Sequence, residues 1–342
     1  MTYEHRNIVI GDESALFFHL HSDMPTFQHE DGSVSMIVRR GFDSTMEGES
    51  HSASRFQTEN PLSSCAHSAT ELSAFNVENP LYGGAPVIVL TDKPSARRRT
   101  KSIYARSCTC DLPASSFWKL RDGLFIASPE LCFVRMARSV PETKLAEIGM
   151  NLCAQYYLDP VSSAIGTRAA NLTTVEKLRS FATSVKGMHG SAKALRAIRW
   201  VLDNSASPFE TKMKLQLCQP LWTGGLALPF TAMNYMVKID QRTKLSSQHS
   251  YSIDLANPEL LIGVEYDGEE YHRNTSADKR RRNELAALGW TIFPIEKEVL
   301  QDPVLTEKTA LQIAKTMKIR IQKPRNWQEK YVQLRKTLDL PI

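Results

Sequence analysis

Three acidic residues lie close together in the stretch between residues 251 and 270. Asp254 follows one short apolar segment, and Glu265 and Asp267 close the next. Carboxylate oxygens are the ligands that Mg²⁺ prefers, and one or two of them usually suffice beside a phosphate. We therefore expect this stretch to hold Mg²⁺ or Mn²⁺ against a phosphodiester, with the backbone carbonyl of Tyr266 as a further ligand.

Two strands joined by a tight turn should position these acids. Residues 251–255 alternate in polarity, and residues 260–266 are almost continuously apolar, as in a strand buried on both faces. The Asn-Pro pair at 257–258 favours a reversal of the chain between them. Because side chains alternate along a strand, Glu265 and Asp267 should share one face. The alternative is that both acids are simply solvated at the end of a strand.

Two further residues are candidates for the same chemistry. Glu210 belongs to the sequence Ser207-Pro208-Phe209-Glu210, which is a capping box at the start of a helix. A structural role for Glu210 therefore competes with a role as a metal ligand. His272 follows the second strand, and an unperturbed histidine pKa of about 6.5 suits proton transfer to a leaving oxygen. A surface histidine on a turn is the alternative there.

A basic helix is predicted from about residue 276 to residue 288. Arg281 shares a helical face with Leu285 and should point toward the sheet. Clustered cations supply the salt-dependent part of nucleic-acid affinity, although such a run is often only a solvated helix face. The cations of this helix that remain free to contact phosphate are Lys279, Arg280 and Arg282.

The order of these residues resembles a family of bacterial proteins. Their C-terminal domain is similar to the very-short-patch mismatch-repair endonuclease, within the PD-(D/E)XK nuclease superfamily. The resemblance covers roughly residues 205–320 of this chain. The positions that carry it are, in order, Asp254, residues 264–268, His272, Asp278, Arg281, Leu285 and Gly289-Trp290.

The resemblance implies a restriction-endonuclease-like fold, in which helices flank a central mixed sheet. Its elements are a helix, a three-strand meander, a helix and a further strand. In this chain they are expected as a helix at 207–221, a first strand at 236–245, the two strands that carry Asp254 and Glu265, the basic helix and a strand at 290–295. It implies that Asp254 is the central metal ligand, Glu265 the second acid and Glu210 the acid of the first helix. His272 matches a catalytic histidine of the repair endonuclease. Asp267 departs from the superfamily, which usually has a lysine there to position the attacking water, although this family commonly carries the aspartate. A carboxylate at this position could instead hold a second metal ion or accept the proton of the water.

The N-terminal half is predicted to be a second α+β region, so the whole chain is expected to be of the α/β (α+β) class. Residues 44–66 are polar and typical of a mobile linker. Residues 67–160, which should begin with a helix at 68–75, resemble the antitoxin-like regulators of abortive-infection systems. Residues 161–204 should form a helical connector, with helices at 174–186 and 191–202. The segments expected in order are 1–66, 67–160, 161–204, the nuclease-like domain at 205–320 and a basic tail at 321–342.

The composition describes a mildly basic chain of 342 residues, with a net charge of +5 and a pI of about 8.8. Of its six cysteines only Cys108 and Cys110 are close in sequence, and no second Cys/His pair completes a zinc site. No apolar run approaches the length of a membrane span, and the first residues lack the pattern of a signal peptide. We therefore expect a cytoplasmic protein with reduced cysteines.

Together these features predict an Mg²⁺-dependent DNA endonuclease, with nicking activity and roles in defence or repair as open options. The competing hypothesis is a non-catalytic DNA-binding regulator or antitoxin, in which the nuclease-like domain is degenerate. RNA is a third candidate substrate. The sequence identifies neither a toxin or other protein partner nor an oligomeric state.

Overall fold

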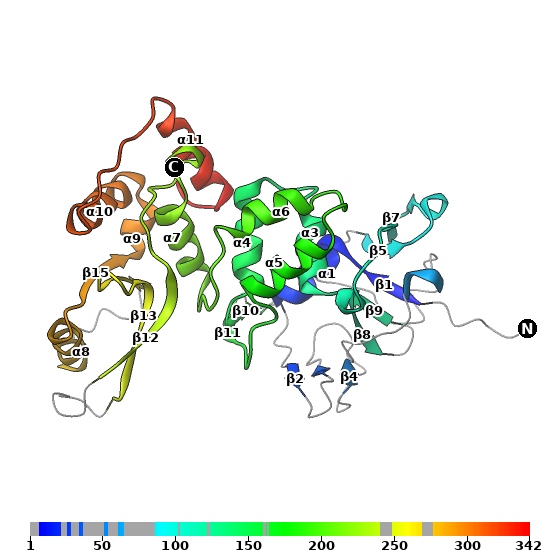
Figure 1. Cartoon of the computed structure of the whole chain (residues 1–342), viewed down its shortest axis with the longest axis horizontal. Coiled ribbons are helices and arrows are strands. Elements are labelled where there is room, and N and C mark those ends of the chain that lie inside the picture. The colour runs from blue at the N-terminus through cyan, green and yellow to red at the C-terminus, as the bar shows by residue number, and fades with distance from the viewer. Residues whose placement is uncertain are drawn as a thin grey trace, which may run out of the picture. The chain divides into compact units, whose positions relative to one another are not determined.

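The chain divides into two compact units, Met1–Arg199 and Trp200–Ile342, and each is described by itself (Figure 1). Both units mix helices and strands. In the parts of the chain that the structure describes, no helix is both long enough and apolar enough to span a membrane. This computed structural model describes residues 7–21, 26–28, 34–36, 51–53, 61–64, 86–101, 103–121, 124–159, 162, 164–239, 248–268 and 276–342.

The first unit is built on a six-stranded mixed sheet with the order β6-β7-β5-β1-β9-β8. The inner strand β1 (Ile8–Ile10) pairs antiparallel with β5 (Val87–Thr91) and parallel with β9 (Leu124–Ala127). All three residues of β1 are fully buried, so a segment that the sequence analysis set apart from residues 67–160 belongs to the same sheet. The remaining strands of this sheet are β6 (Arg98–Arg99), β7 (Ile103–Ser107) and β8 (Phe117–Arg121).

Five helices of the described chain pack in this unit, and α3 contacts α1, α4, α5 and α6. The helices predicted at 174–186 and 191–202 are confirmed with shorter bounds, whereas the helix predicted at 68–75 lies outside the described residues. The helices are α1 (Asp12–His21), α3 (Pro129–Met136), α4 (Glu142–Leu152), α5 (Val175–Ser184) and α6 (Ser191–Ile198). Smaller strands are β2 (Thr26–Gln28), β3 (Val34–Met36), β4 (His51–Ala53), β10 (Tyr156–Leu158) and β11 (Ile165–Thr167).

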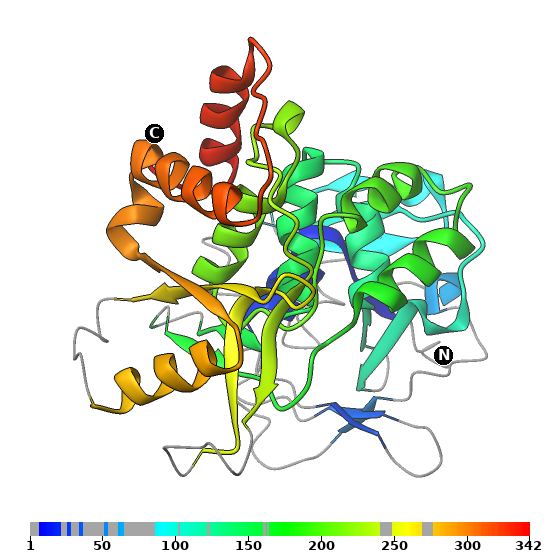
Figure 2. The same ribbon diagram turned by 60° about the vertical axis from the view of Figure 1, so that its left-hand side comes forward.

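The second unit contains a four-stranded sheet with the order β12-β13-β14-β15. Its first three strands form an antiparallel meander, and β15 returns parallel to β14 after helix α8, which packs beside β15 (Figure 2). The elements therefore follow the order expected from the sequence. They are α7 (Pro208–Cys218), β12 (Ala232–Lys238), β13 (Ser250–Asn257), β14 (Ile262–Asp267), α8 (Ser276–Ala287) and β15 (Thr291–Glu296).

The strand bounds differ from the prediction at two places. The first strand was expected at 236–245, but β12 begins at Ala232, and residues 240–247 lie outside the described chain. The second strand was expected to start at Leu260, yet Leu260 and Leu261 belong to the turn and are exposed. The side chain of Asn257 accepts a hydrogen bond from the Leu260 N–H at 3.0 Å, so a capped turn takes these two leucines out of the strand.

One hydrophobic cluster of the second unit joins the sheet to α8. Ile253 and Ala256 of β13 pack there with Leu285 of α8 and with Trp290. The segment 321–342, predicted to be a basic tail, instead includes a helix whose Tyr331 is buried. The last helices are α9 (Lys297–Gln301), α10 (Pro303–Thr316) and α11 (Trp327–Thr337).

Candidate functional site

Strands β13 and β14 stop pairing at the level of the predicted acids. Their last paired residues are Leu255 and Val264. Beyond this pair, the Tyr266 N–H donates to Oδ2 of Asp254 at 2.8 Å. The N–H and C=O of one strand residue point to the same side, so the Tyr266 carbonyl also lies on the side that faces β13. A backbone oxygen and an aspartate are thus brought together where the two strands part.

Glu265 and Tyr266 point to opposite faces of β14, as neighbours on a strand must. The ring of Tyr266 stacks on Phe209 of α7, with a centroid distance of 5.2 Å. The carboxylate of Glu265 forms an ion pair with Arg281 of α8, at 2.5 Å between Oε1 and Nη2. The end of β14 is therefore held from one face by α7 and from the other by α8.

Glu210 forms one half of the capping box that the sequence predicts. Its N–H donates to Oγ of the N-cap residue Ser207 at 3.2 Å. Its Oε2 accepts from the N–H of Ala206, one residue before the N-cap, at 2.9 Å and from Asn234 Nδ2 at 2.8 Å. Burial, and next the charge of Asp254, raise the pKa of Glu210 from 4.5 to about 7, although the hydrogen bonds lower it. Glu210 therefore has a structural role, and it also interacts electrostatically with Asp254.

Burial raises the pKa values of the two strand acids as well. For Glu265 burial is the largest cause, the Arg281 charge opposes it, and Asp254 and Asp267 add to it, so its pKa is raised to about 7. The pKa of Asp254 is also raised, because burial outweighs the Tyr266 N–H and Arg281. A nearby cation favours the charged form of such acids, so binding of a cation would lower these pKa values and promote the loss of their protons.

Asp267 shares the face of Glu265, in agreement with the predicted alternation. In the parallel register its partner is Glu296 of β15, an acid that the sequence analysis did not single out. The signal for Glu296 was weak, since only the parallel pairing of β14 and β15 places it beside Asp267. Asp254, Glu265 and Asp267 are close enough for Asp267 to raise the pKa values of both of the other acids. His272 lies outside the described residues.

A complete set of metal ligands is not assembled among the described residues. No group of three or more His, Cys, Asp or Glu side chains there is close enough to hold a metal ion. Two carboxylates with backbone oxygen and water suffice for Mg²⁺, so the residues that fit are Asp254, Glu265 and the carbonyl of Tyr266. In this arrangement Glu210 is occupied as a helix cap, and Glu265 already shares one oxygen with Arg281.

The basic residues of α8 divide as the helical pattern predicts. Arg281 points toward the sheet, where its Nη2 also donates to the Ser252 carbonyl at 2.6 Å. The Arg282 charge lowers the pKa of Glu265 from the same end of the site. The three cations that we expected to contact phosphate are all solvent-exposed, namely Lys279, Arg280 and Arg282.

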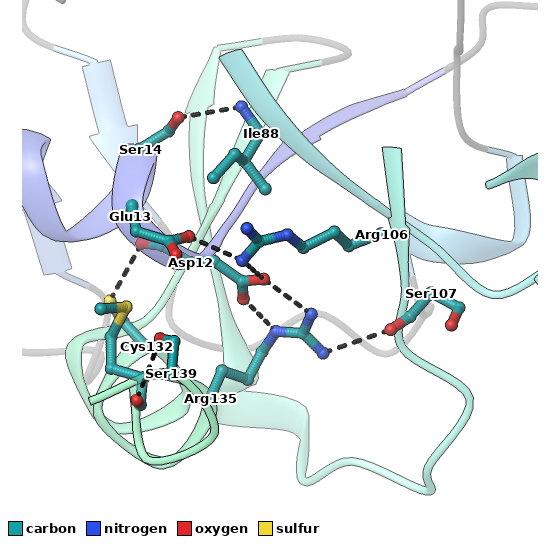
Figure 3. Close-up of polar contacts among 10 residues, drawn as sticks. Asp12, Glu13, Ser14, Ile88, Arg106, Ser107, Cys132, Arg135 and Ser139 are labelled. Carbon is teal, nitrogen blue, oxygen red and sulfur yellow. Dashed lines mark hydrogen bonds and ion pairs between the residues drawn. The ribbon is translucent and has the colours of Figure 1, made fainter. Parts of the chain in front are cut away.

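A second charged cluster lies in the first unit (Figure 3). Asp12, the first residue of α1, is only 4% exposed. Arg135 donates to both of its carboxylate oxygens, and Arg106 donates to Asp12 at 3.0 Å and to Glu13 at 2.7 Å. Burial favours the neutral acid, but the charges and hydrogen bonds of Arg135 and Arg106 outweigh it and lower the pKa of Asp12. This cluster was not predicted from the sequence, since its partners Asp12, Arg106 and Arg135 are far apart along the chain.

Comparisons of the chain with protein-family models, with curated proteins and with solved structures find no match. The function of the site is therefore argued from its own residues. Those residues are an aspartate at a strand divergence, a glutamate paired with an arginine, and further acids that add negative charge to both.

Proposed function

We propose that the second unit is a divalent-metal-dependent DNA endonuclease with a restriction-endonuclease-like arrangement of its elements. The observation that carries this proposal is that Asp254 and Glu265 are two neighbouring acids whose pKa values are raised, first by burial and then by the charge of Asp267, with Asp254 also raising the pKa of Glu265. Such a pair at the end of a sheet attracts a cation strongly. Perturbed acids of this kind are concentrated at functional sites.

The metal would be held by Asp254, Glu265 and the carbonyl of Tyr266. When bound, Mg²⁺ lowers the pKa of its water and offsets negative charge on the scissile phosphate. The Tyr266 N–H orients the Asp254 carboxylate, because it occupies Oδ2 at 2.8 Å. The ion pair with Arg281 orients Glu265 in the same way. Both acids are therefore fixed before any ligand arrives.

We assign proton transfer to neighbouring acids and to His272, which lies outside the described residues. Glu210, with a pKa of about 7, is suited to exchange a proton near neutral pH. We assign Asp267 to a second metal ion or to the proton of the attacking water, and His272 to the leaving oxygen. The exposed cations Lys279, Arg280 and Arg282 would contact the DNA backbone without reading its sequence.

Plasmid cleavage tests the proposal. Full-length protein is incubated with supercoiled DNA and Mg²⁺ or Mn²⁺, beside Asp254→Ala, Glu265→Ala and the matched control Glu259→Ala, an exposed acid in the turn of the same hairpin. We expect nicking or linearisation by the wild type and the control, and a loss of about a hundredfold or more in both site variants. Equal cleavage by all four proteins would identify a contaminating nuclease and remove support for the site.

A non-catalytic DNA-binding regulator or antitoxin is the second candidate. Two observations favour it: Glu265 is already neutralised by Arg281, and the described residues form no three-ligand metal group. A regulator of this type binds DNA through its cations alone. It would bind a labelled duplex equally well with a chelator and with Mg²⁺, and Asp254→Ala would bind as the wild type does. A parallel assay with single-stranded and duplex RNA separates the RNA alternative.

A further inference from the structure

Arg281 is the basic side chain that enters the candidate site from α8. Its Nη2 donates to Oε1 of Glu265 and, at 2.6 Å, to the carbonyl of Ser252. Its guanidinium carbon also lies 5.7 Å from the centroid of the Tyr251 ring, within the range of a cation–π contact. Two of these three partners do not depend on Glu265, so they would retain the guanidinium near the site if Glu265 turned away.

The two partners of the ion pair differ in their access to solvent. The side chain of Arg281 is 32% exposed and that of Glu265 is 15% exposed. The side chain of Arg281 is therefore the more accessible partner, whereas that of Glu265 is largely enclosed. An arginine carries five N–H donors in a planar fork, which matches two oxygens of a phosphate.

We propose that a divalent cation displaces Arg281 from Glu265, and that the released guanidinium then binds a phosphate of the nucleic acid. This proposal rests on the proposed function. Two positive charges placed on the Glu265 carboxylate repel a guanidinium at hydrogen-bonding distance from it. The Ser252 carbonyl and the Tyr251 ring keep Arg281 in place, and an incoming phosphate provides the anion that Glu265 no longer offers. Metal binding and nucleic-acid binding are thereby coupled through one side chain.

This exchange predicts that loss of the Arg281 charge has opposite effects on the two ligands. In Arg281→Gln the cation no longer competes with a guanidinium, so metal binding tightens, by about three- to tenfold. The same variant loses the phosphate contact. The ratio of the DNA affinity with metal to the affinity without metal should therefore be about tenfold smaller in Arg281→Gln than in the wild type. An arginine with a purely structural role would behave differently, because its removal would loosen the site and weaken both ligands together.

The first experiment is a calorimetric titration of Ca²⁺, an oxygen-seeking cation, into the full chain without DNA. We compare the wild type with Arg281→Gln, with Arg281→Lys and with Arg179→Gln, a control that removes an exposed arginine from α5 of the first unit. We expect tighter binding only in Arg281→Gln. Arg281→Lys keeps the positive charge that competes with the cation and Arg179→Gln leaves the site unchanged, so both should stay within about twofold of the wild type. The second experiment measures the affinity for a labelled DNA duplex with and without Ca²⁺ in the same four proteins.

The outcomes separate this proposal from the proposed function. If the wild type binds no metal, the proposed function fails and the exchange fails with it. If the wild type binds metal and Arg281→Gln binds it equally or more weakly, the exchange alone is overturned. Should Arg281→Gln not fold, the wild type decides by itself: the arginine side-chain NMR signal that disappears in Arg281→Lys must shift when Ca²⁺ is added without DNA. A signal that saturating Ca²⁺ leaves in place overturns the proposal.

Discussion

The two units of this chain both bury carboxylates, but the charges around them shift the pKa values in opposite directions. In the first unit Asp12 has Arg135 and Arg106 as partners, and its pKa lies below the ordinary value despite burial. In the second unit Glu265 has Arg281 as its ion-pair partner, while Asp254 accepts a backbone N–H, and both pKa values are raised. Burial alone would raise all three pKa values. Two arginines that bond directly to the Asp12 carboxylate outweigh burial there, whereas in the second unit neighbouring acids add to burial, Asp267 at Asp254 and both Asp254 and Asp267 at Glu265.

The difference separates a structural cluster from a site that requires a ligand. Asp12 and Glu13 pair with Arg135 and Arg106, so the cluster of the first unit is close to charge balance and adding a cation there gains little. The second cluster sets four acids, Asp254, Glu265, Asp267 and Glu210, against two cations, Arg281 and Arg282, so it carries an excess of negative charge when its acids are ionised. That excess is the physical reason for assigning metal chemistry to the second unit and structural support to the first.

Removal of Asp12 should have the largest effect on stability. In Asp12→Ala the guanidinium of Arg135, whose side chain is 2% exposed, is left buried without its carboxylate, which costs about 3–5 kcal/mol. Chemical denaturation of the full chain, followed by fluorescence of the buried Trp118, measures this loss. Glu13→Ala is the matched control, and because Glu13 is 37% exposed it should lose less than about 1 kcal/mol. Equal, small losses would show that the Asp12 cluster is not structural.

Glu210 should make the second unit lose stability as the pH rises. Its pKa in the folded state is raised from 4.5 to about 7, so its stabilising contribution is complete below pH 4.5 and is lost as the pH rises through 7. Glu210→Gln retains an oxygen for the capping bond but cannot ionise, so it should remove roughly 1–3 kcal/mol of the decline between pH 5 and pH 8. Denaturation midpoints of the two proteins at both pH values test this.

The direction of that pH effect is opposite to the one expected for Asp12. A lowered pKa means that the Asp12 contribution is present above its ordinary value of 3.8 and is lost only as the pH falls further. Identical pH profiles for the wild type and Glu210→Gln would contradict the raised pKa and weaken the contrast between the clusters.

Local patterns were enough to predict the elements that carry the candidate site. The alternation before Asp254, the apolar run before Glu265 and the capping box at Glu210 are all short-range signals, and the structure contains each element. The turn at Leu260 was misassigned, because an apolar run does not show that Asn257 caps the turn and removes two leucines from the strand. The apolar run correctly predicted a strand, but the strand begins at Ile262 and not at Leu260, because the Leu260 N–H bonds to the side chain of Asn257 in the turn.

Long-range charge pairing could not be predicted in the same way. Asp12 and Arg135 are 123 positions apart, and their approach depends on the packing of α1 against α3. The predicted orientation of Arg281 was confirmed, yet its pairing with Glu265 depends on how α8 lies on the sheet. Helical periodicity gives the face of a residue but not the partner that it meets. The pKa shifts depend on both burial and partner charges, so they could not be predicted from the sequence.

Divalent metal should stabilise the second unit and leave the first unchanged. At a concentration tenfold above the dissociation constant, Mg²⁺ should add about 1.4 kcal/mol to the stability of the unit that binds it. Amide hydrogen exchange locates the effect, with slower exchange expected in β13 and β14 and no change in β1. Asp254→Asn keeps an acceptor for the Tyr266 N–H but removes a ligand charge, so it should lose most of the protection. Protection that persists in this variant would place the metal elsewhere.

The smallest effect should distinguish the exposed cations of the two units. Lys279 of α8 and Arg99 of β6 are both exposed, but only Lys279 belongs to the unit with the candidate site. Lys279→Ala should weaken binding to any duplex by about two- to threefold and reduce the salt dependence of the affinity by about one counterion. Arg99→Ala should leave both quantities unchanged, as measured by fluorescence anisotropy at several salt concentrations. If Arg99→Ala has the larger effect, the DNA lies on the first unit, and the excess negative charge around Asp254 serves a ligand other than the one we propose.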